Sequence, residues 1–168
     1  MTEGVLLATL SIPNEDVMHE FGIRLAAVLA PGDLVLLTGP LGAGKTTLTR
    51  GVGEGLGVIG TVASPTFVIA RTHKRQNSDG PLVHVDAYRL GSPAEFDDLD
   101  IDFENSIVLV EWARGFADEL TDSWLDIEIE RDHTGASEVR TVTITGFGER
   151  FNSDASRQQY AALPGGLA

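Results

Sequence analysis

The apolar positions of the chain follow two patterns. Short runs that are continuously apolar, or that alternate with polar residues, predict strands. They lie at residues 5–10, 33–38, 82–88, 107–110, 124–130 and 139–145. Residues 63–72 also look extended. Apolar positions three or four residues apart predict a helix that begins at Asn14 and a second helix over residues 45–56. The acidic stretch 93–103 has helical spacing as well, and a short helix is expected around Ala117.

The order and type of these elements indicate one α/β domain. Strands 33–38 and 107–110 are apolar without alternation, as expected for strands covered on both faces. The turn-rich segment DHTGAS between the last two strands predicts an antiparallel C-terminal hairpin. We therefore expect residues 1–147 to form a single three-layer α/β domain with a mixed sheet. Residues 148–168 are rich in Gly, Ser and Gln and are expected to form a flexible tail.

The second predicted helix contains Gly51, Gly53 and Gly55. Each glycine in a helix interior costs about 1 kcal/mol relative to alanine. So much glycine indicates either close packing against a neighbouring element or a helix that is easily deformed. The sequence leaves both interpretations open.

Composition and charge narrow the classes of function. The 168 residues carry 12 basic and 25 acidic side chains, a formal net charge of −13, which argues against direct binding of nucleic acid. The chain has no cysteine, which excludes disulfides, iron–sulfur clusters and thiol catalysis. Its four histidines show no metal-ligand spacing. No apolar run approaches the roughly 18 residues of a membrane helix, and a cytoplasmic protein is expected.

One motif carries clear chemistry. Residues 39–46, GPLGAGKT, fit the phosphate-loop pattern G-x-x-x-x-G-K-[ST], with a predicted strand before them and a predicted helix after them. Glycines allow several backbone N–H groups to point at one anion, and the helix N-terminus adds its dipole. Lys45 then reaches the β- and γ-phosphates, and the Thr46 hydroxyl can ligate Mg²⁺. The sequence therefore predicts a P-loop NTPase-like fold that binds a nucleoside triphosphate with Mg²⁺. The residues expected around the nucleotide are Gly39, Pro40, Leu41, Gly42, Ala43, Gly44, Lys45, Thr46 and Thr47.

A phosphate-loop protein also needs a carboxylate for the metal, usually at the end of a second buried strand. Glu111 directly follows the apolar run 107–110, and Asp86 lies near the end of strand 82–88. Glu111 fits the metal position better, and Asp86 would then orient the attacking water or lie close to the metal. Each can also be an ordinary solvated acid at a strand end.

Several other positions are open to two interpretations. Residues 64–66, Ser-Pro-Thr, suit either a γ-phosphate sensor with Thr66 as its hydroxyl or a plain turn. His84 is favoured as a packed or hydrogen-bonded structural histidine. Trp112 suits either a ligand-stacking or a core-capping residue. Arg89 and Arg114 can stabilise phosphoryl charge or pair with nearby acids.

Four segments together go beyond a generic phosphate loop. They are GPLGAGKTTLTRGVGEGLG, SPTFVI, HVDAYRL and LVEW, in this order. In these segments, over about residues 12–145, the chain resembles the TsaE (formerly YjeE) family. These are small bacterial ATPases needed for the threonylcarbamoyladenosine modification of tRNA.

The resemblance implies a role for each matching residue. Residues 39–46 would hold the phosphates of ATP or ADP, Thr46 and Glu111 would bind Mg²⁺, and Asp86 would serve hydrolysis. Thr66 would be the switch threonine, Trp112 would lie beside the nucleotide, and Glu15 would lie near the adenine or ribose. The family acts on a TsaB–TsaD heterodimer, so tRNA would be reached only indirectly.

The chain departs from the family in three places. Ala113-Arg114 follow Trp112 where an acid or amide is common, and Asp100 stands where glycine is more usual. The residues after Phe147 show no pattern of the family. Arg140 is aligned with a family arginine that follows the hairpin turn.

Three functions are compatible with these sequence features. The first is a weak ATPase that assists the tRNA-modifying complex. The alternative is a small-molecule P-loop kinase, although the acidic stretch 95–104 replaces the arginine-rich lid usual in such kinases. The third is a nucleotide-gated adaptor with negligible catalysis.

Overall fold

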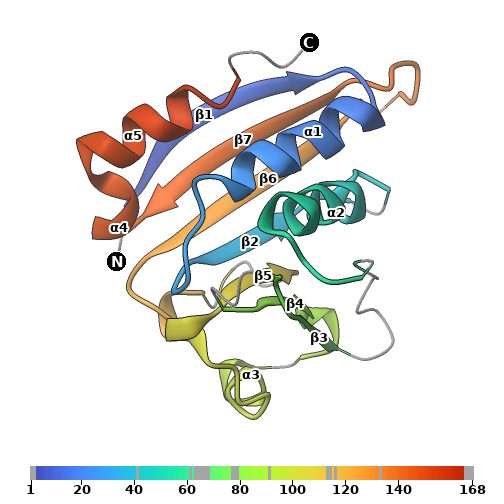
Figure 1. The fold of residues 1–168 in the computed structure, drawn as a ribbon. Helices are drawn as coiled ribbons and strands as arrows, with labels where there is room; N and C mark the ends of the chain where they lie inside the picture. The colour runs from blue at the N-terminus through green and yellow to red at the C-terminus, as the bar shows by residue number, and fades with distance from the viewer. Residues whose placement is uncertain are drawn as a thin grey trace.

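A mixed β-sheet forms the centre of the molecule. The computed structural model describes residues 3–40, 42–60, 62, 69–76, 80–90, 92–112, 115, 117–132 and 134–164. Seven strands are ordered β1-β7-β6-β2-β5-β4-β3 across the sheet (Figure 1). Their bounds are β1 Gly4–Ile12, β2 Leu34–Thr38, β3 Ala70–His73, β4 Leu82–Asp86, β5 Ile107–Glu111, β6 Trp124–Arg131 and β7 Arg140–Phe147.

The middle of the sheet is parallel and both sides are antiparallel. Strand β2 pairs in parallel with β5 and with β6, and β5 pairs in parallel with β4. At one edge β3 runs antiparallel to β4, and on the other side β7 pairs antiparallel with both β6 and β1. The predicted mixed sheet and C-terminal hairpin are confirmed. Because β2, β4 and β5 point the same way, their carboxyl ends share one edge of the sheet, where α/β proteins bind ligands.

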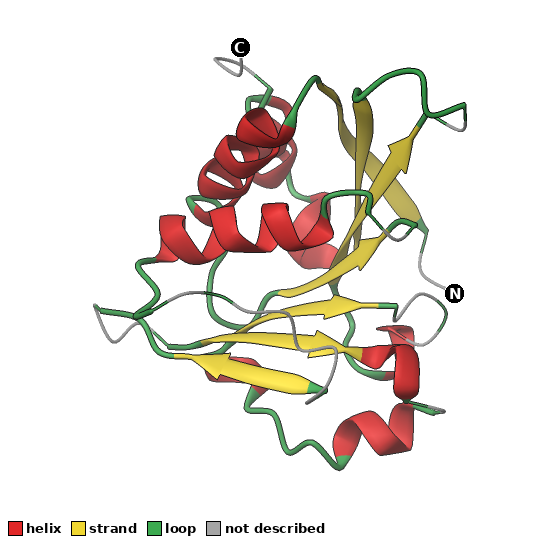
Figure 2. Ribbon diagram, turned by 90° about the vertical axis from the view of Figure 1, so that its right-hand side faces the viewer, coloured by secondary structure: helices red, strands yellow, loops and turns green. Residues whose placement is uncertain are grey.

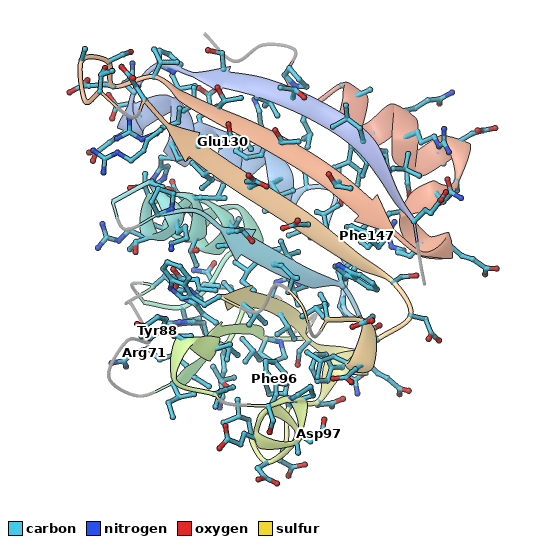
Figure 3. The ribbon with its side chains drawn as sticks, turned by 180° about the vertical axis from the view of Figure 1, so that it is seen from behind. Arg71, Tyr88, Phe96, Asp97, Glu130 and Phe147 are labelled. Atoms are coloured by element: carbon cyan, nitrogen blue, oxygen red, sulfur yellow. The ribbon has the colours of Figure 1, made fainter. Side chains whose placement is uncertain are left out.

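Helices lie on both faces of this sheet (Figure 2). The helices on one face are α1 (Glu15–Ala26), α2 (Lys45–Leu56), α4 (Glu149–Asn152) and α5 (Asp154–Ala161). The other face carries α3 (Pro93–Asp97) and short 3₁₀ turns at Ala87–Arg89, Phe103–Asn105 and Ala117–Glu119. Figure 3 looks onto this second face. Phe96 lies over the parallel strands, and Glu130 and Phe147 lie at opposite ends of the hairpin. Two apolar clusters, one per face, complete the expected three layers. In the described part of the chain, no helix has the length and hydropathy to cross a membrane.

Helix α1 begins after Asn14, as predicted. Asn14 caps it, since its side-chain oxygen accepts a hydrogen bond of 3.0 Å from the Val17 N–H.

Close contact between α1 and α2 explains the glycines of the second helix. A Cβ atom on Gly51 would collide with the carbonyl oxygen of His19 and lie 3.0 Å from the Cα of Gly22. A Cβ on Gly55 would lie 2.6 Å from the Cβ of Ala26. Gly51 and Gly55 therefore permit close helix–helix packing, whereas a Cβ on Gly53 would lie 2.5 Å from the side chain of Val62.

Of the stretch 63–72, which was expected to be extended, residues 70–72 lie in β3, Ile69 precedes it with a left-handed φ of 69°, and residues 63–68 lie outside the described residues. Two other expected segments are shorter in the structure. The strand expected to reach Tyr88 ends at Asp86, whose Oδ1 accepts a hydrogen bond of 3.0 Å from the Tyr88 N–H and starts a 3₁₀ turn. The helix expected over 93–103 ends at Asp97, and Asp100 then has a left-handed backbone with φ of 54°.

The prediction of a flexible C-terminal tail is wrong for residues 148–164. These residues form α4 and α5, and Phe151, Tyr160 and Leu163 are buried in the same apolar cluster as α1. The ring of Tyr160 meets Phe151 edge-on at 6.0 Å. The apolar residues of this segment are few and separated by polar ones, so their burial is not evident from composition.

A partly buried ion pair holds the C-terminal helices to the sheet. The Arg150 guanidinium donates two hydrogen bonds of 3.2 Å to the Asp33 carboxylate, just before β2, and one of 3.1 Å to the Ser156 hydroxyl. Asp33 is 4% exposed, and this burial raises the pKa of its carboxyl against the lowering effect of Arg150 and of the Ala30 N–H. The segment after β7 is thus fixed to the strand that leads to residue 39.

Gly51→Ala tests the packing role of the α2 glycines. Alanine would favour an isolated helix by about 1 kcal/mol. Here the collision with His19 reverses the sign, and we expect a loss of about 1–3 kcal/mol in the free energy of unfolding. Urea denaturation measures the change, and Arg50→Ala, at an exposed site on the same helix, should stay within about 0.5 kcal/mol of the parent. A Gly51→Ala protein more stable than the parent would contradict close packing.

Phe151→Ala tests the C-terminal helices. Phe151 is fully buried, so its truncation should cost about 3–5 kcal/mol in the free energy of unfolding. Gln159→Ala, on the exposed side of α5, serves as the control and should change it by less than about 0.5 kcal/mol. Equal stabilities of the two variants would show that residues 148–164 are not part of the folded core.

Candidate phosphate-binding site

The turn between β2 and α2 has the backbone of a phosphate loop. Gly42 and Gly44 adopt left-handed conformations, with φ of 77° and 111°. Residues other than glycine rarely adopt this conformation. The Ala43 N–H donates to the Pro40 carbonyl at 3.1 Å, and Gly44 directly precedes the first residue of α2. Leu41 lies outside the described residues. The loop therefore ends at a helix N-terminus, where backbone N–H groups and the helix dipole favour an anion.

Lys45 is the cation of this loop. Its side chain is 7% exposed, and its Nζ donates a hydrogen bond of 2.7 Å to the Gly39 carbonyl. The same Nζ lies 3.8 Å from the centroid of the Trp112 ring, a cation–π contact. Burial lowers the pKa of Lys45, and the charges of Glu111 and Asp86 partly counteract this effect. An anion in the loop would replace the weak neutral partners of this ammonium by charged ones.

Two carboxylates face the loop from the neighbouring strands. Asp86 ends β4 and Glu111 ends β5, and the two residues are direct partners in the register of these parallel strands. Both are nearly buried, at 8% and 7% exposure. Glu111 Oε2 lies 2.9 Å from the Nε2 atom of His84, and Asp86 is held by the Tyr88 N–H. Two adjacent buried carboxylates repel each other, and a divalent cation would relieve this repulsion.

Trp112 has a strained backbone beside these acids. Its φ of 66° is left-handed, which costs a bulky residue about 1–3 kcal/mol. Its ring is 41% exposed and meets the ring of Tyr88, 74% exposed, edge-on at 5.6 Å. This conformation turns an aromatic face toward Lys45 instead of continuing β5.

A cavity of about 590 Å³ brings these groups together. Its lining consists of Glu15, Gly42, Gly44, Lys45, Thr46, Thr47, Asp86, Tyr88, Glu111 and Trp112. The sequence predicted all of these residues except Tyr88. Of the other predicted site residues, Thr66 and Arg114 lie outside the described residues. Pro40 lines a separate hollow, together with residues of β6 and of the hairpin turn.

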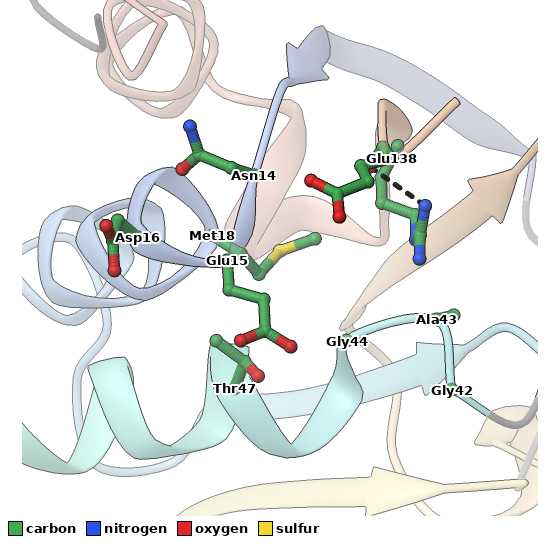
Figure 4. Close-up of a pocket in the computed structure, with 10 residues that line it drawn as sticks. Asn14, Glu15, Asp16, Met18, Gly42, Ala43, Gly44, Thr47 and Glu138 are labelled. Carbon is green, nitrogen blue, oxygen red and sulfur yellow. Dashed lines mark hydrogen bonds between the residues drawn. The ribbon is translucent and has the colours of Figure 1, made fainter. Parts of the chain in front are cut away.

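A second hollow of about 330 Å³ continues from this cavity toward the N-terminus of α1. The two share Glu15, Gly42, Gly44 and Thr47 in their linings. Figure 4 shows the carboxylate of Glu15 and the side chain of Thr47 pointing toward one another across it. Arg140 also lines this hollow, and its Nη1 donates to the Glu138 carbonyl at 2.8 Å. The space suits a group attached to the anion in the loop.

Comparison with known proteins identifies the family. The family model described as "Threonylcarbamoyl adenosine biosynthesis protein TsaE" matches residues 12–141. The chain belongs to the TsaE family. Relatives with the name tRNA threonylcarbamoyladenosine biosynthesis protein TsaE include one from Streptomyces coelicolor, 57% identical over 80% of this chain and 93% of that protein. Another, from Bacillus subtilis, is 41% identical over 75% of this chain and 77% of that protein.

The fold agrees with that of a solved structure. A crystal structure of Bacillus subtilis YdiB superposes with a TM-score of 0.71 and 29% identity, and covers 95% of each chain. The chain thus has the α/β, P-loop NTPase-like fold, as the sequence predicted.

The aspartate at position 100, where the sequence analysis expected glycine to be more usual, has a physical explanation. Asp100 adopts the left-handed backbone for which glycine is preferred, and aspartate is among the residues that tolerate it.

The sequence did not predict the hydrogen-bond partner of His84. As the sequence favoured, His84 is a buried, hydrogen-bonded histidine, and its ring contacts the Glu111 carboxylate. The available signal was its position two residues before Asp86, which places both side chains on the same face of one strand.

Proposed function

We propose that this TsaE-family chain binds Mg-ATP and hydrolyses it slowly, as an accessory of the complex that makes N6-threonylcarbamoyladenosine in tRNA. One observation carries the proposal. The cation of the phosphate loop, the hydroxyl of Thr46 and two adjacent carboxylates line a single cavity at the carboxyl ends of parallel strands. Polyphosphate chemistry with a divalent metal uses this combination of groups.

The side chains present fit a magnesium ion. Mg²⁺ takes oxygen ligands and is usually bound through one or two carboxylates together with substrate phosphates and water. Thr46 would offer its hydroxyl and Glu111 its carboxylate, with Asp86 beside them. When bound, the ion would neutralise charge that develops on the phosphates. Lys45 would meanwhile exchange its contact with the Gly39 carbonyl for the β- and γ-phosphates.

We propose that Asp86 acts on the attacking water. Its Oδ1 accepts the Tyr88 N–H, which fixes the carboxylate at the end of β4, next to Glu111 and within the cavity. A carboxylate in this position can orient a water molecule and accept its proton during attack on the γ-phosphate. Thr66 is proposed as the switch threonine on the resemblance of its segment alone.

The second hollow is proposed to take the nucleoside. Glu15 and Thr47 lie where both hollows meet, so a triphosphate in the loop would direct its ribose and base between them. Glu15 would accept hydrogen bonds from ribose hydroxyls or the adenine amino group, since an ionised carboxylate only accepts. Arg140 would cover the far side, consistent with its alignment to a family arginine.

Proteins, rather than tRNA, are the proposed direct partners. With a net charge of −13, the chain would be repelled by the phosphates of free tRNA. We propose that it docks on a TsaB–TsaD-type heterodimer, which leaves tRNA contact to that heterodimer, and that ATP hydrolysis gates this association. The related proteins are named for the same modification, which supports this assignment.

Lys45→Ala tests nucleotide binding. A hydrogen bond to a charged group contributes about 1.5–3 kcal/mol, so we expect the dissociation constant for Mg-ATP to rise about 10- to 100-fold. Isothermal titration calorimetry gives this constant directly. Lys74→Ala changes the chain's other lysine, an exposed residue after β3, and should bind like the parent. Equal affinities of the two variants would refute the phosphate-loop assignment.

Asp86→Asn tests hydrolysis. The amide keeps the size of the carboxyl but loses its basicity, so we expect the rate of phosphate release to fall at least about 100-fold while the affinity for ATP changes less than about threefold. Asp97→Asn, on exposed α3, is the matched control and should hydrolyse ATP at the parental rate.

The same preparations decide between the candidate functions. Formation of modified tRNA is followed over many turnovers with a TsaB–TsaD-type heterodimer, ATP and each variant. Asp86→Asn should support at most one round per bound ATP. Unimpaired multiple turnover by this variant would favour a pure nucleotide-gated adaptor. A phosphorylated nucleoside or shikimate-like acceptor formed faster than free phosphate would favour a small-molecule kinase.

A further inference from the structure

His84 makes a buried hydrogen bond that the proposed reaction has not used so far. It lies in the middle of β4, with its side chain fully buried, and its Nε2 is 2.9 Å from Oε2 of Glu111 at the end of β5. In the register of these strands Glu111 lies opposite Asp86, two residues after His84. The ring of His84 therefore contacts, from the neighbouring strand, the carboxylate of an acid that lines the cavity.

The chemistry of the two groups fixes the direction of this bond. An ionised carboxylate has no proton to donate, so Nε2 of the imidazole carries the hydrogen and donates it. The other ring nitrogen, Nδ1, is buried without a hydrogen-bond partner among the described residues. Leaving a buried polar atom unpaired is unfavourable, and an apolar side chain would fill the same space without that penalty. The residue type is thus explained by Nε2 and its bond to Glu111.

This bond constrains the carboxylate of Glu111. With Oε2 held by His84, the carboxylate cannot rotate freely about its last torsion, and its second oxygen remains for a cation in the cavity. Asp86 is restrained in a comparable way, through the Tyr88 N–H on its Oδ1. Each of the two acids therefore has one oxygen fixed by the protein, a pattern common around metal ligands.

We propose that His84 is a positioning residue that orients Glu111 for the divalent cation accompanying the nucleotide. This inference rests on the proposed function, because Glu111 is a metal ligand only if Mg-nucleotide binds. It predicts that loss of the Nε2 donor weakens cation binding, whereas binding of the nucleotide without a cation is retained.

A pair of amide variants tests the proposal. His84→Gln places its amide nitrogen close to the position of Nε2, whereas in His84→Asn, one methylene shorter, the amide nitrogen falls short of Glu111. Mg²⁺ is titrated by calorimetry into each protein saturated with a non-hydrolysable ATP analogue, with Mn²⁺ and its electron paramagnetic resonance signal as a second probe. We expect the cation dissociation constant to rise about 10- to 100-fold for His84→Asn and less than about threefold for His84→Gln. In EDTA, the analogue should bind both variants within about threefold of the parent.

Two further comparisons make the result specific. His73→Gln, on adjacent β3, changes another histidine with an unpartnered ring nitrogen and should leave the cation constant unchanged. In a Glu111→Ala background, His84→Asn should cause no additional loss, because the group it orients is gone. If His84→Asn fails to fold, as thermal unfolding would show, His84→Leu takes its place.

The outcomes separate this inference from the proposed function. If the parent protein binds cation with the analogue and His84→Asn does so equally well, His84 is not a positioning residue and the proposed function stands. The same holds if His84→Gln and His84→Asn lose cation binding to the same extent, or if the loss persists in the Glu111→Ala background. If the parent itself binds no cation with the analogue, both proposals fail.

Discussion

The parallel pairing of β2 with β5, and of β5 with β4, is the constraint on which the site depends. It brings three strand ends to one edge of the sheet, so that the phosphate loop, Glu111 and Asp86 meet although they are far apart in the sequence. The register is specific, because a shift of one residue would turn both acids to the opposite face of the sheet. The apolar residues of these strands, buried on both faces, hold that register.

Burial makes the charges of this site interdependent. Lys45, Asp86 and Glu111 are each less than a tenth exposed, so their interactions are weakly screened. The two acids raise the pKa of Lys45 against the effect of burial, and His84 holds one of them by a hydrogen bond. The left-handed backbone of Trp112 adds strain at the same place. An anionic ligand with a divalent cation would satisfy the lysine and the carboxylates together, which is why a polar, strained site is compatible with a stable fold.

The sequence predicted the parts of this structure that depend on local pattern. The phosphate loop, the cap of α1 at Asn14 and the hairpin follow from motif and periodicity. The close packing of Gly51 could not be chosen over a deformable helix, because the atoms it approaches belong to another element. The partner of His84 was not predicted for a similar reason, since Glu111 is 27 residues away on a neighbouring strand. The burial of Phe151 and Tyr160 could not be predicted, because the segment around them is mostly polar. Only its tertiary contacts show which of its residues face the core.

The unpredicted C-terminal helices are connected to the site through β2. Asp33, at the start of this strand, is held by Arg150 and by the Ala30 N–H, while Thr38 at its end donates to Asp126 of β6 at 3.3 Å. The strand that presents the phosphate loop is thus anchored at both ends by side chains from the C-terminal part of the chain. Because a phosphate loop binds its ligand with backbone N–H groups, small displacements of β2 would misalign several donors at once. Residues 148–164 therefore help to fix the strand from which the loop departs, although none of them lines either hollow of the site.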